Sequence, residues 1–163
     1  YLNSYDRHKL VTFGAIGSAA CAITLNNGDH NDVTNIMTNA GFTSRDSEYF
    51  AKAADGSIKV LKAGYYEIVF SGLYNAMNDA VGSRVKRLSI AKRTSAENAT
   101  TYTNTAQLTF AERCLSWETQ KVSWMFYLAA NERISFLVQC EGSTASATST
   151  FAYMGGYIRR LGA

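Results

Sequence analysis

Residues 55–75, Asp-Gly-Ser-Ile-Lys-Val-Leu-Lys-Ala-Gly-Tyr-Tyr-Glu-Ile-Val-Phe-Ser-Gly-Leu-Tyr-Asn, decide the fold of this chain. Ile58 and Val60 alternate with polar residues before Gly64, and a longer alternating run begins there at once. Because the side chains of a strand point to opposite faces with a period of two residues, both runs predict β-strands. The residues that one face of the longer strand would bury are Tyr66, Ile68 and Phe70.

The opposite face of the longer strand is mixed rather than polar. It carries Tyr65, Glu67, Val69 and Ser71. A half-apolar outward face on a central strand indicates that another surface covers it. We therefore expect this face to lie in an interface.

Strand patterns recur along most of the chain, separated by turn residues at intervals of about ten residues. Ten strands are predicted, at roughly 9–16, 20–25, 47–53, 57–62, 64–75, 84–92, 104–111, 119–129, 132–140 and 150–160. So many short strands without intervening helices predict a closed or nearly closed antiparallel sandwich. The best helix candidate, 28–41, is rich in Asn and Thr, which are weak helix formers, and it is predicted to be a long loop with at most one short helical turn.

The strands at 119–129 and 132–140 alternate most regularly between apolar and other residues. The connector between them, 129–132, is short enough for a β-hairpin. Together with the central stretch, these patterns predict a core. Its members are Ile58, Tyr66, Ile68, Phe70, Trp124, Phe126, Ile134 and Phe136.

Length and composition limit the class of protein. A chain of 163 residues has the size of one domain with its own core. The net charge of +3 is small and the basic residues are scattered, which argues against nucleic-acid binding. No apolar run is long enough to insert into a membrane. The chain begins with Tyr rather than Met, so we expect a fragment or head domain of a larger chain.

Groups that could perform chemistry are sparse. His8 and His30 are the only histidines, and hydrolase, metalloprotease and phosphate-binding motifs are absent. The loop Asp29-His30-Asn31-Asp32 offers oxygen ligands for calcium, but its spacing differs from the twelve-residue calcium loop and is typical of turns. Cys21, Cys114 and Cys140 form no CxxC pair, which favours buried thiols or one disulfide over a zinc site. We therefore expect no enzyme, no metal and no cofactor.

Glu67 would be a carboxylate on the interface face and should need a partner. Arg159 or Arg160 on the last strand could supply one. The pattern predicts a structural ion pair there.

Three segments resemble the C1q/TNF-like domain. Gly56-Ser57-Ile58-Lys59-Val60 followed by Gly64-Tyr65-Tyr66-Glu67-Ile68 resembles the central strand pair of that family. Residues 128–136 are similar to the family's hairpin, with Asn131-Glu132 where Gly-Asp would be expected. Phe151-Ala152-Tyr153-Met154-Gly155-Gly156-Tyr157-Ile158 resembles its closing strand.

The resemblance implies one antiparallel ten-stranded jelly roll over 1–163 that assembles as a compact homotrimer, with one sheet of each copy facing the three-fold axis. Apolar residues that point away from the predicted core agree with such an interface. Scattered surface apolar residues are the alternative. The predicted trimer interface comprises Tyr65, Glu67, Val69, Met125, Tyr127 and Tyr157.

The predicted function is that of a non-enzymatic structural or binding module on a virion or cell surface, such as a phage head or tail decoration, a fibre knob or a receptor-binding protein. Low charge and loops rich in Ser, Thr, Asn and Tyr suit recognition of a surface glycan or protein receptor. The absence of proline and of a Gly-x-y stalk favours a phage or bacterial protein, located on the virion surface or outside the cell. A bacterial spore or cell-surface protein, and an enzyme or capsid jelly roll with an unrecognised site, are the alternatives.

Overall fold

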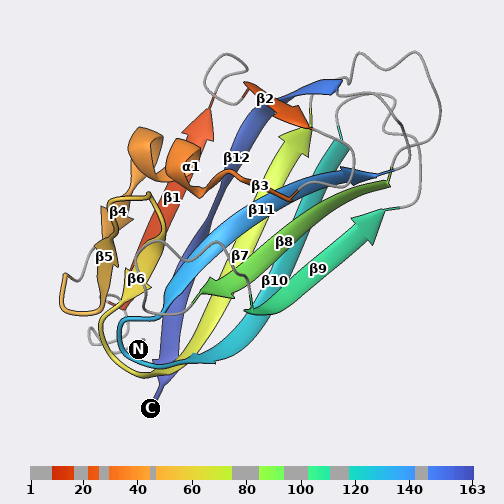
Figure 1. Ribbon diagram of the computed structural model, residues 1–163. Helices are drawn as coiled ribbons and strands as arrows, with labels where there is room; N and C mark the ends of the chain where they lie inside the picture. The colour runs from red at the N-terminus through yellow and green to blue at the C-terminus, as the bar shows by residue number, and fades with distance from the viewer. Residues whose placement is uncertain are drawn as a thin grey trace, which may run out of the picture.

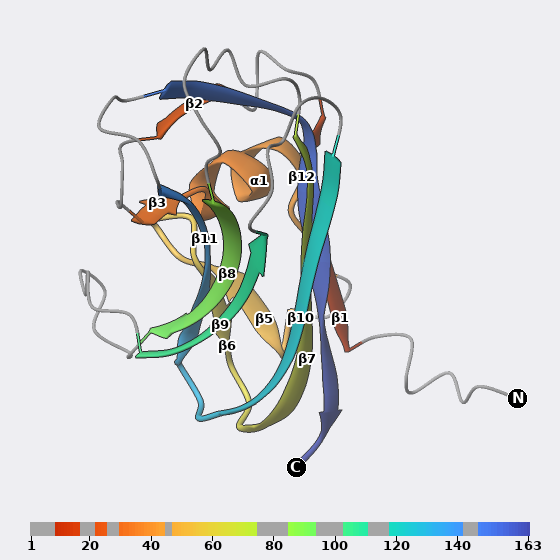
Figure 2. The same ribbon diagram turned by 90° about the vertical axis from the view of Figure 1, so that its right-hand side faces the viewer.

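The computed structural model describes residues 9–16, 22–25, 30–44, 47–74, 85–93, 103–110, 118–141 and 147–163. Within these ranges the chain has twelve strands and one short helix. The strands form two antiparallel sheets that pack face to face, as Figure 2 shows from the side. The predicted all-β antiparallel sandwich is confirmed. Two strands beyond the predicted ten, β3 and β4, are too short to produce an alternating pattern.

Each sheet contains six strands. Sheet 1 has the order β10 (Glu118–Leu128), β7 (Gly64–Tyr74), β12 (Ala147–Gly162), β1 (Leu10–Ile16) and β4 (Thr43–Ser44), with β2 (Ala22–Leu25) on β12. Sheet 2 has the order β5 (Phe50–Lys52), β6 (Ile58–Val60), β11 (Arg133–Glu141), β8 (Val85–Arg93) and β9 (Thr103–Phe110), with β3 (His30–Asp32) on β11 (Figure 1). The last strand, β12, therefore lies in the middle of sheet 1, between β7 and β1.

The core lies between the sheets and is built from the inward faces of the alternating strands. The rings of Phe13 and Phe70, both on sheet 1, contact that of Phe136 on sheet 2, with centroids 4.5 and 5.0 Å apart. Burying a side chain of this size contributes about 1.5–3 kcal/mol. Seven of the eight residues predicted for the core are buried: Ile58, Tyr66, Ile68, Phe70, Phe126, Ile134 and Phe136.

Trp124 is the exception, and the prediction that it lies in the core is wrong. It lies opposite Ile68 in the β10–β7 register and so points to the inner side of sheet 1, but 53% of it is exposed. The exposure is local to Trp124, because Val122 and Phe126, its neighbours on the same face of β10, are only 6 and 7% exposed. The indole contacts the ring of Phe126 at 6.2 Å between centroids, at the open side of the sandwich.

The connector 129–132 is not a hairpin, because β10 belongs to sheet 1 and β11 to sheet 2. The turn crosses from one sheet to the other and is held beside β6. The backbone N–H of Asn131 donates to the carbonyl of Val60 at 2.8 Å, and the N–H of Val60 donates to the carbonyl of Glu132 at 3.0 Å. The connector is short enough for a hairpin. It does not form one because β10 and β11 lie in different sheets and bury their apolar faces from opposite sides of the core.

Residues 34–41, predicted as loop, form an α-helix, α1 (Thr34–Gly41). The carboxylate of Asp32 accepts the N–H of Thr34 at 2.9 Å at its start, and Met37 is fully buried. The side chain of Thr34 accepts the N–H of Phe136 at 2.7 Å, which joins the helix to β11. Tertiary packing of this kind outweighs the weak helix propensity of Asn and Thr.

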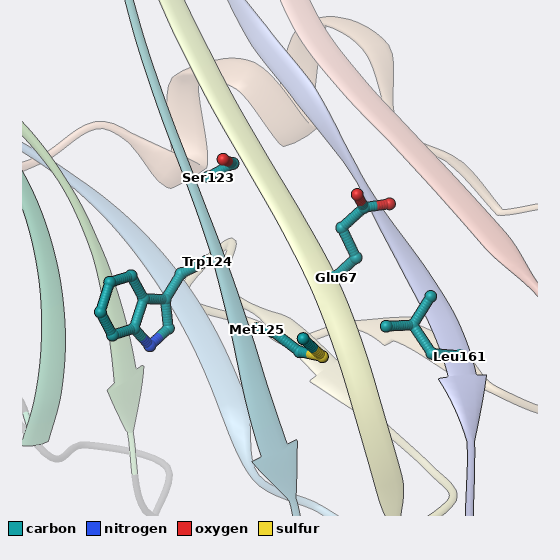
Figure 3. Close-up of a pocket in the computed structure, with 5 residues that line it drawn as sticks. All are labelled: Glu67, Ser123, Trp124, Met125 and Leu161. Carbon is teal, nitrogen blue, oxygen red and sulfur yellow. The ribbon is translucent and has the colours of Figure 1, made fainter.

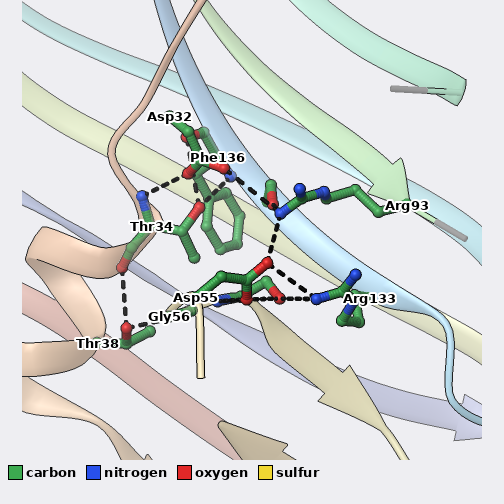
Figure 4. Close-up of polar contacts among 10 residues, drawn as sticks. Asp32, Thr34, Thr38, Asp55, Gly56, Arg93, Arg133 and Phe136 are labelled. Carbon is green, nitrogen blue, oxygen red and sulfur yellow. Dashed lines mark hydrogen bonds and ion pairs between the residues drawn. The ribbon is translucent and has the colours of Figure 1, made fainter. Parts of the chain in front are cut away.

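A charged cluster connects the turn between β5 and β6 with the neighbouring strands β11 and β8 of the same sheet (Figure 4). Arg93 and Arg133 lie directly opposite each other on β8 and β11, and both are buried. Like charges in this position repel each other. Asp55 compensates for this repulsion, because its Oδ2 lies 2.9 Å from Nη1 of each arginine. Ser57 donates to Oδ1 of Asp55 through both its hydroxyl and its backbone N–H.

Acid should therefore weaken the fold through Asp55. Burial tends to raise the pKa of this carboxyl, but the hydrogen bonds from Ser57 and the charges of Arg133 and Arg93 outweigh burial and lower the pKa below its usual value. A lowered folded-state pKa stabilises the fold fully above the unfolded value of about 3.9, and this contribution is lost as the pH falls through the folded pKa.

Urea denaturation at a series of pH values between about 6 and 2 measures this loss. The wild-type midpoint should fall more steeply below about pH 4 than that of Asp55→Asn, which cannot titrate at this position. Equal acid dependence of the two proteins would contradict the prediction.

Candidate functional site

The six residues predicted for an interface lie together on the outer face of sheet 1, the face turned away from sheet 2. Tyr127 lies opposite Tyr65 and Met125 lies opposite Glu67 in the β10–β7 register. Val69 lies opposite Tyr157 in the β7–β12 register. Directly opposed residues share a face of a sheet, so the register brings all six onto one surface.

An apolar patch forms one end of this outer face. Its members, Tyr65, Met125, Tyr127 and Leu161, are each about half exposed, at 49, 59, 52 and 48%. The rings of Tyr65 and Tyr127 meet edge to face, with centroids 5.3 Å apart. Leu161 was not predicted, because it lies at a register irregularity between Arg160 and Gly162 that breaks the alternation of β12.

The structure differs from the predicted interface in the exposure of Val69 and in two further exposed residues at the other end of the outer face. Val69 lies on the outer face but is only 5% exposed, so little of it is available to a partner. Beyond it, Ile16 lies opposite Tyr153, and the two are 82 and 37% exposed. Sequence reasoning missed both. On the outward face of β1, Thr12 and Gly14 stand between Leu10 and Ile16 and interrupt the apolar alternation.

An open depression lies beside the apolar patch (Figure 3). It is lined by Glu67, Ser123, Trp124, Met125 and Leu161. Figure 3 shows Met125 and Leu161 on either side of β7, near Glu67, while the indole of Trp124 points away from them. Its lining is mostly apolar, with Glu67 and Ser123 as the polar members, an arrangement suited to packing against another surface.

The carboxylate is already partnered within the chain. Nη2 of Arg159 lies 2.8 Å from Oε2 of Glu67, and the hydroxyl of Tyr157 donates to the same oxygen at 3.3 Å. Burial, and next the charge and hydrogen bond of Glu67, raise the pKa of the Tyr157 hydroxyl above its usual value. The predicted ion pair is present with Arg159, whereas Arg160 donates to the carbonyl of Ala63 at 2.8 Å.

Other candidate groups give no site within the described part of the chain. No group of three or more His, Cys, Asp or Glu among these residues could hold a metal ion. His30 and Asp32 belong to β3 rather than to a loop. No helix among them is long and apolar enough to cross a membrane. His8, Asp29, Cys21 and Cys114, and the side chains of His30 and Cys140, lie outside what the structure describes.

No protein-family model matches the sequence, and no curated protein matches it. Several solved structures are similar in fold, among them the following two. The Eiger TNF of S. frugiperda superposes with a TM-score of 0.55 at 8% identity, covering 95% of both chains. Murine APRIL, solved at pH 8.0, superposes with a TM-score of 0.53 at 9% identity, covering 93% of this chain and 99% of the other.

The fold is a TNF-like jelly roll. This confirms the fold implied by the resemblance to the C1q/TNF-like domain. At such low identity the similarity shows the fold alone. In the TNF-like jelly roll of this chain, the apolar patch and the Glu67 network occupy three neighbouring strands, β10, β7 and β12.

Proposed function

We propose that the protein is a non-enzymatic binding module that works as a homotrimer, with the outer face of sheet 1 buried between the copies. The observation that carries this proposal is the apolar patch. Tyr65, Met125 and Tyr127 are each about half exposed on adjoining strands. Contiguous exposed apolar side chains mark interaction surfaces, and aromatic residues and Met are enriched at the centre of protein interfaces.

Three copies around a closed axis are favoured over an open array. The resemblance of the sequence to the C1q/TNF-like domain implies a trimer, and the TNF-like fold supports that resemblance. Cyclic closure buries the same surface on every copy and leaves none exposed. Tyr65, Met125 and Tyr127 would contribute most to the contact and Val69 little. Glu67 and Tyr157 would also lie within it.

The trimer would act on the surface of a phage virion or a bacterial cell, where it recognises a glycan or a protein receptor. Support comes from composition: no proline, a net charge of only +3 and ten tyrosines. Tyr offers a rigid apolar face with a hydrogen-bonding tip, which suits such recognition. A bacterial spore or cell-surface protein is the second candidate on the same grounds.

Multi-angle light scattering tests the assembly directly. At micromolar concentration the purified chain should have the mass of three copies, unchanged on moderate dilution. A mass of one copy would overturn the proposal, since the apolar patch would then face water. Once the trimer is established, a glycan array and binding to whole bacterial cells test the surface role.

A further inference from the structure

Glu67, Arg159 and Tyr157 form a polar layer across the middle of the outer face. Glu67 and Arg159 lie directly opposite each other on β7 and β12, and Tyr157 is the next outward residue along β12. Arg159 and Tyr157 both bind Oε2 of Glu67, at distances of 2.8 and 3.3 Å. The ion pair is still partly open to water, with the side chains of Arg159 and Glu67 52 and 31% exposed.

Apolar residues lie on both sides of the polar layer. Tyr65 and Tyr127 lie toward one end of the strands, and Ile16 and Tyr153 toward the other. An assembly that buries the whole outer face must therefore bury the polar layer too.

Burial of the layer has a cost in affinity. Removing an ion pair from water is only partly offset by the attraction between its charges, and apolar side chains of similar size often associate more tightly. What a polar group in an apolar interface can provide is specificity. It can fix the register and the number of copies, as a buried Asn does in coiled coils. The polar layer has the position for such a role.

The position of the ion pair fits a second copy of this chain as the partner. Glu67 on β7 and Arg159 on β12 lie at the same height along the strands, with Met125 and Leu10 beside them on the flanking strands β10 and β1. A rotation axis parallel to the strands keeps every residue at its height, so the ion pairs of all copies lie level with one another. An arrangement that slides along the strands, or runs antiparallel, would place each ion pair against Tyr65 and Tyr127 or against Ile16 and Tyr153. A buried ion pair whose remaining hydrogen-bonding atoms face apolar side chains is disfavoured.

We infer that the polar layer fixes the register and the number of copies in the assembly, at some cost to its affinity. This inference rests on the proposed homotrimer. It assigns the attraction between copies to the apolar patch and the choice of arrangement to Glu67 and Arg159.

The test replaces the ion pair by apolar residues in the double variant Glu67→Leu, Arg159→Leu. Native mass spectrometry should show one trimeric species for the wild type. The double variant should still associate on dilution at least as far as the wild type, but as a mixture of dimers, trimers and larger species. The charge-swapped variant Glu67→Arg, Arg159→Glu keeps a neutral layer and should restore a single trimer.

Each result supports or overturns the inference. A double variant that is uniformly trimeric, or that becomes monomeric, would overturn the role of the layer while leaving the homotrimer standing. A monomeric wild type would overturn both. Far-UV circular dichroism checks the fold, and if the Leu variant fails to fold, Glu67→Met, Arg159→Met removes the polar groups with unbranched side chains closer to the original shapes and is interpreted in the same way.

Discussion

Replacing Tyr127 by Asp should convert the trimer into monomers at micromolar concentration. Tyr127 is 52% exposed and its ring packs edge to face on Tyr65 within the apolar patch. In the assembly this position would be dry, and a buried charge without a partner costs about 3–5 kcal/mol. At about 1.4 kcal/mol per tenfold change, that weakens each contact by two to three orders of magnitude or more. Sedimentation velocity measures the change directly.

The matched control is Asn39→Asp. Asn39 is exposed on α1, away from the outer face, and the substitution adds the same single negative charge. It should leave the trimer intact, which separates a local effect from one of net charge. A folded Tyr127→Asp protein that remains trimeric would show that the copies do not meet at the apolar patch.

Replacing Asp55 by Asn should lower the free energy of unfolding by about 3 kcal/mol. The side chain of Asp55 is 31% exposed, but those of Arg93 and Arg133 are only 8 and 1% exposed. Without the carboxylate, two opposed guanidinium groups stay buried and repel each other. The low end of the usual range applies because Asp55 is itself partly hydrated and because Oδ2 of Asp32 remains 3.8 Å from Nη1 of Arg93. Urea denaturation at neutral pH measures the difference.

A triple variant sharpens the assignment. Asp55→Asn combined with Arg93→Met and Arg133→Met removes the buried positive charges as well, so it should recover part of the lost stability. If Asp55→Asn alone stays within about 0.5 kcal/mol of the wild type, the cluster contributes nothing measurable and the prediction fails.

The faces of the strands could be predicted from the sequence because the period of two is a property of the backbone itself. Tyr66, Ile68 and Phe70 are buried for this reason, and Tyr65 and Glu67 lie on the other face. The period does not report how much of each inward side chain the opposite layer covers. Trp124 therefore lies on the predicted inner side of sheet 1, but it is not buried as predicted.

Features that depend on distant partners could not be predicted. The α1 helix exists because Met37 is buried and Thr34 binds β11, and neither contact is visible in a run of Asn and Thr. Asp55 meets Arg93 and Arg133 only after three separate segments have been brought together. Sheet pairing decides such contacts, and a single sequence does not disclose the pairing.

The central position of β12 has a consequence for synthesis in the cell. Sheet 1 stays divided into two parts, one holding β1 and the other β7 and β10, until residues 147–162 have left the ribosome. During translation the apolar inner faces of both parts have no permanent neighbour, and such nascent intermediates are prone to aggregate. Chaperone binding and slow, late maturation are therefore to be expected of the newborn chain, since pairing between distant segments is intrinsically slow.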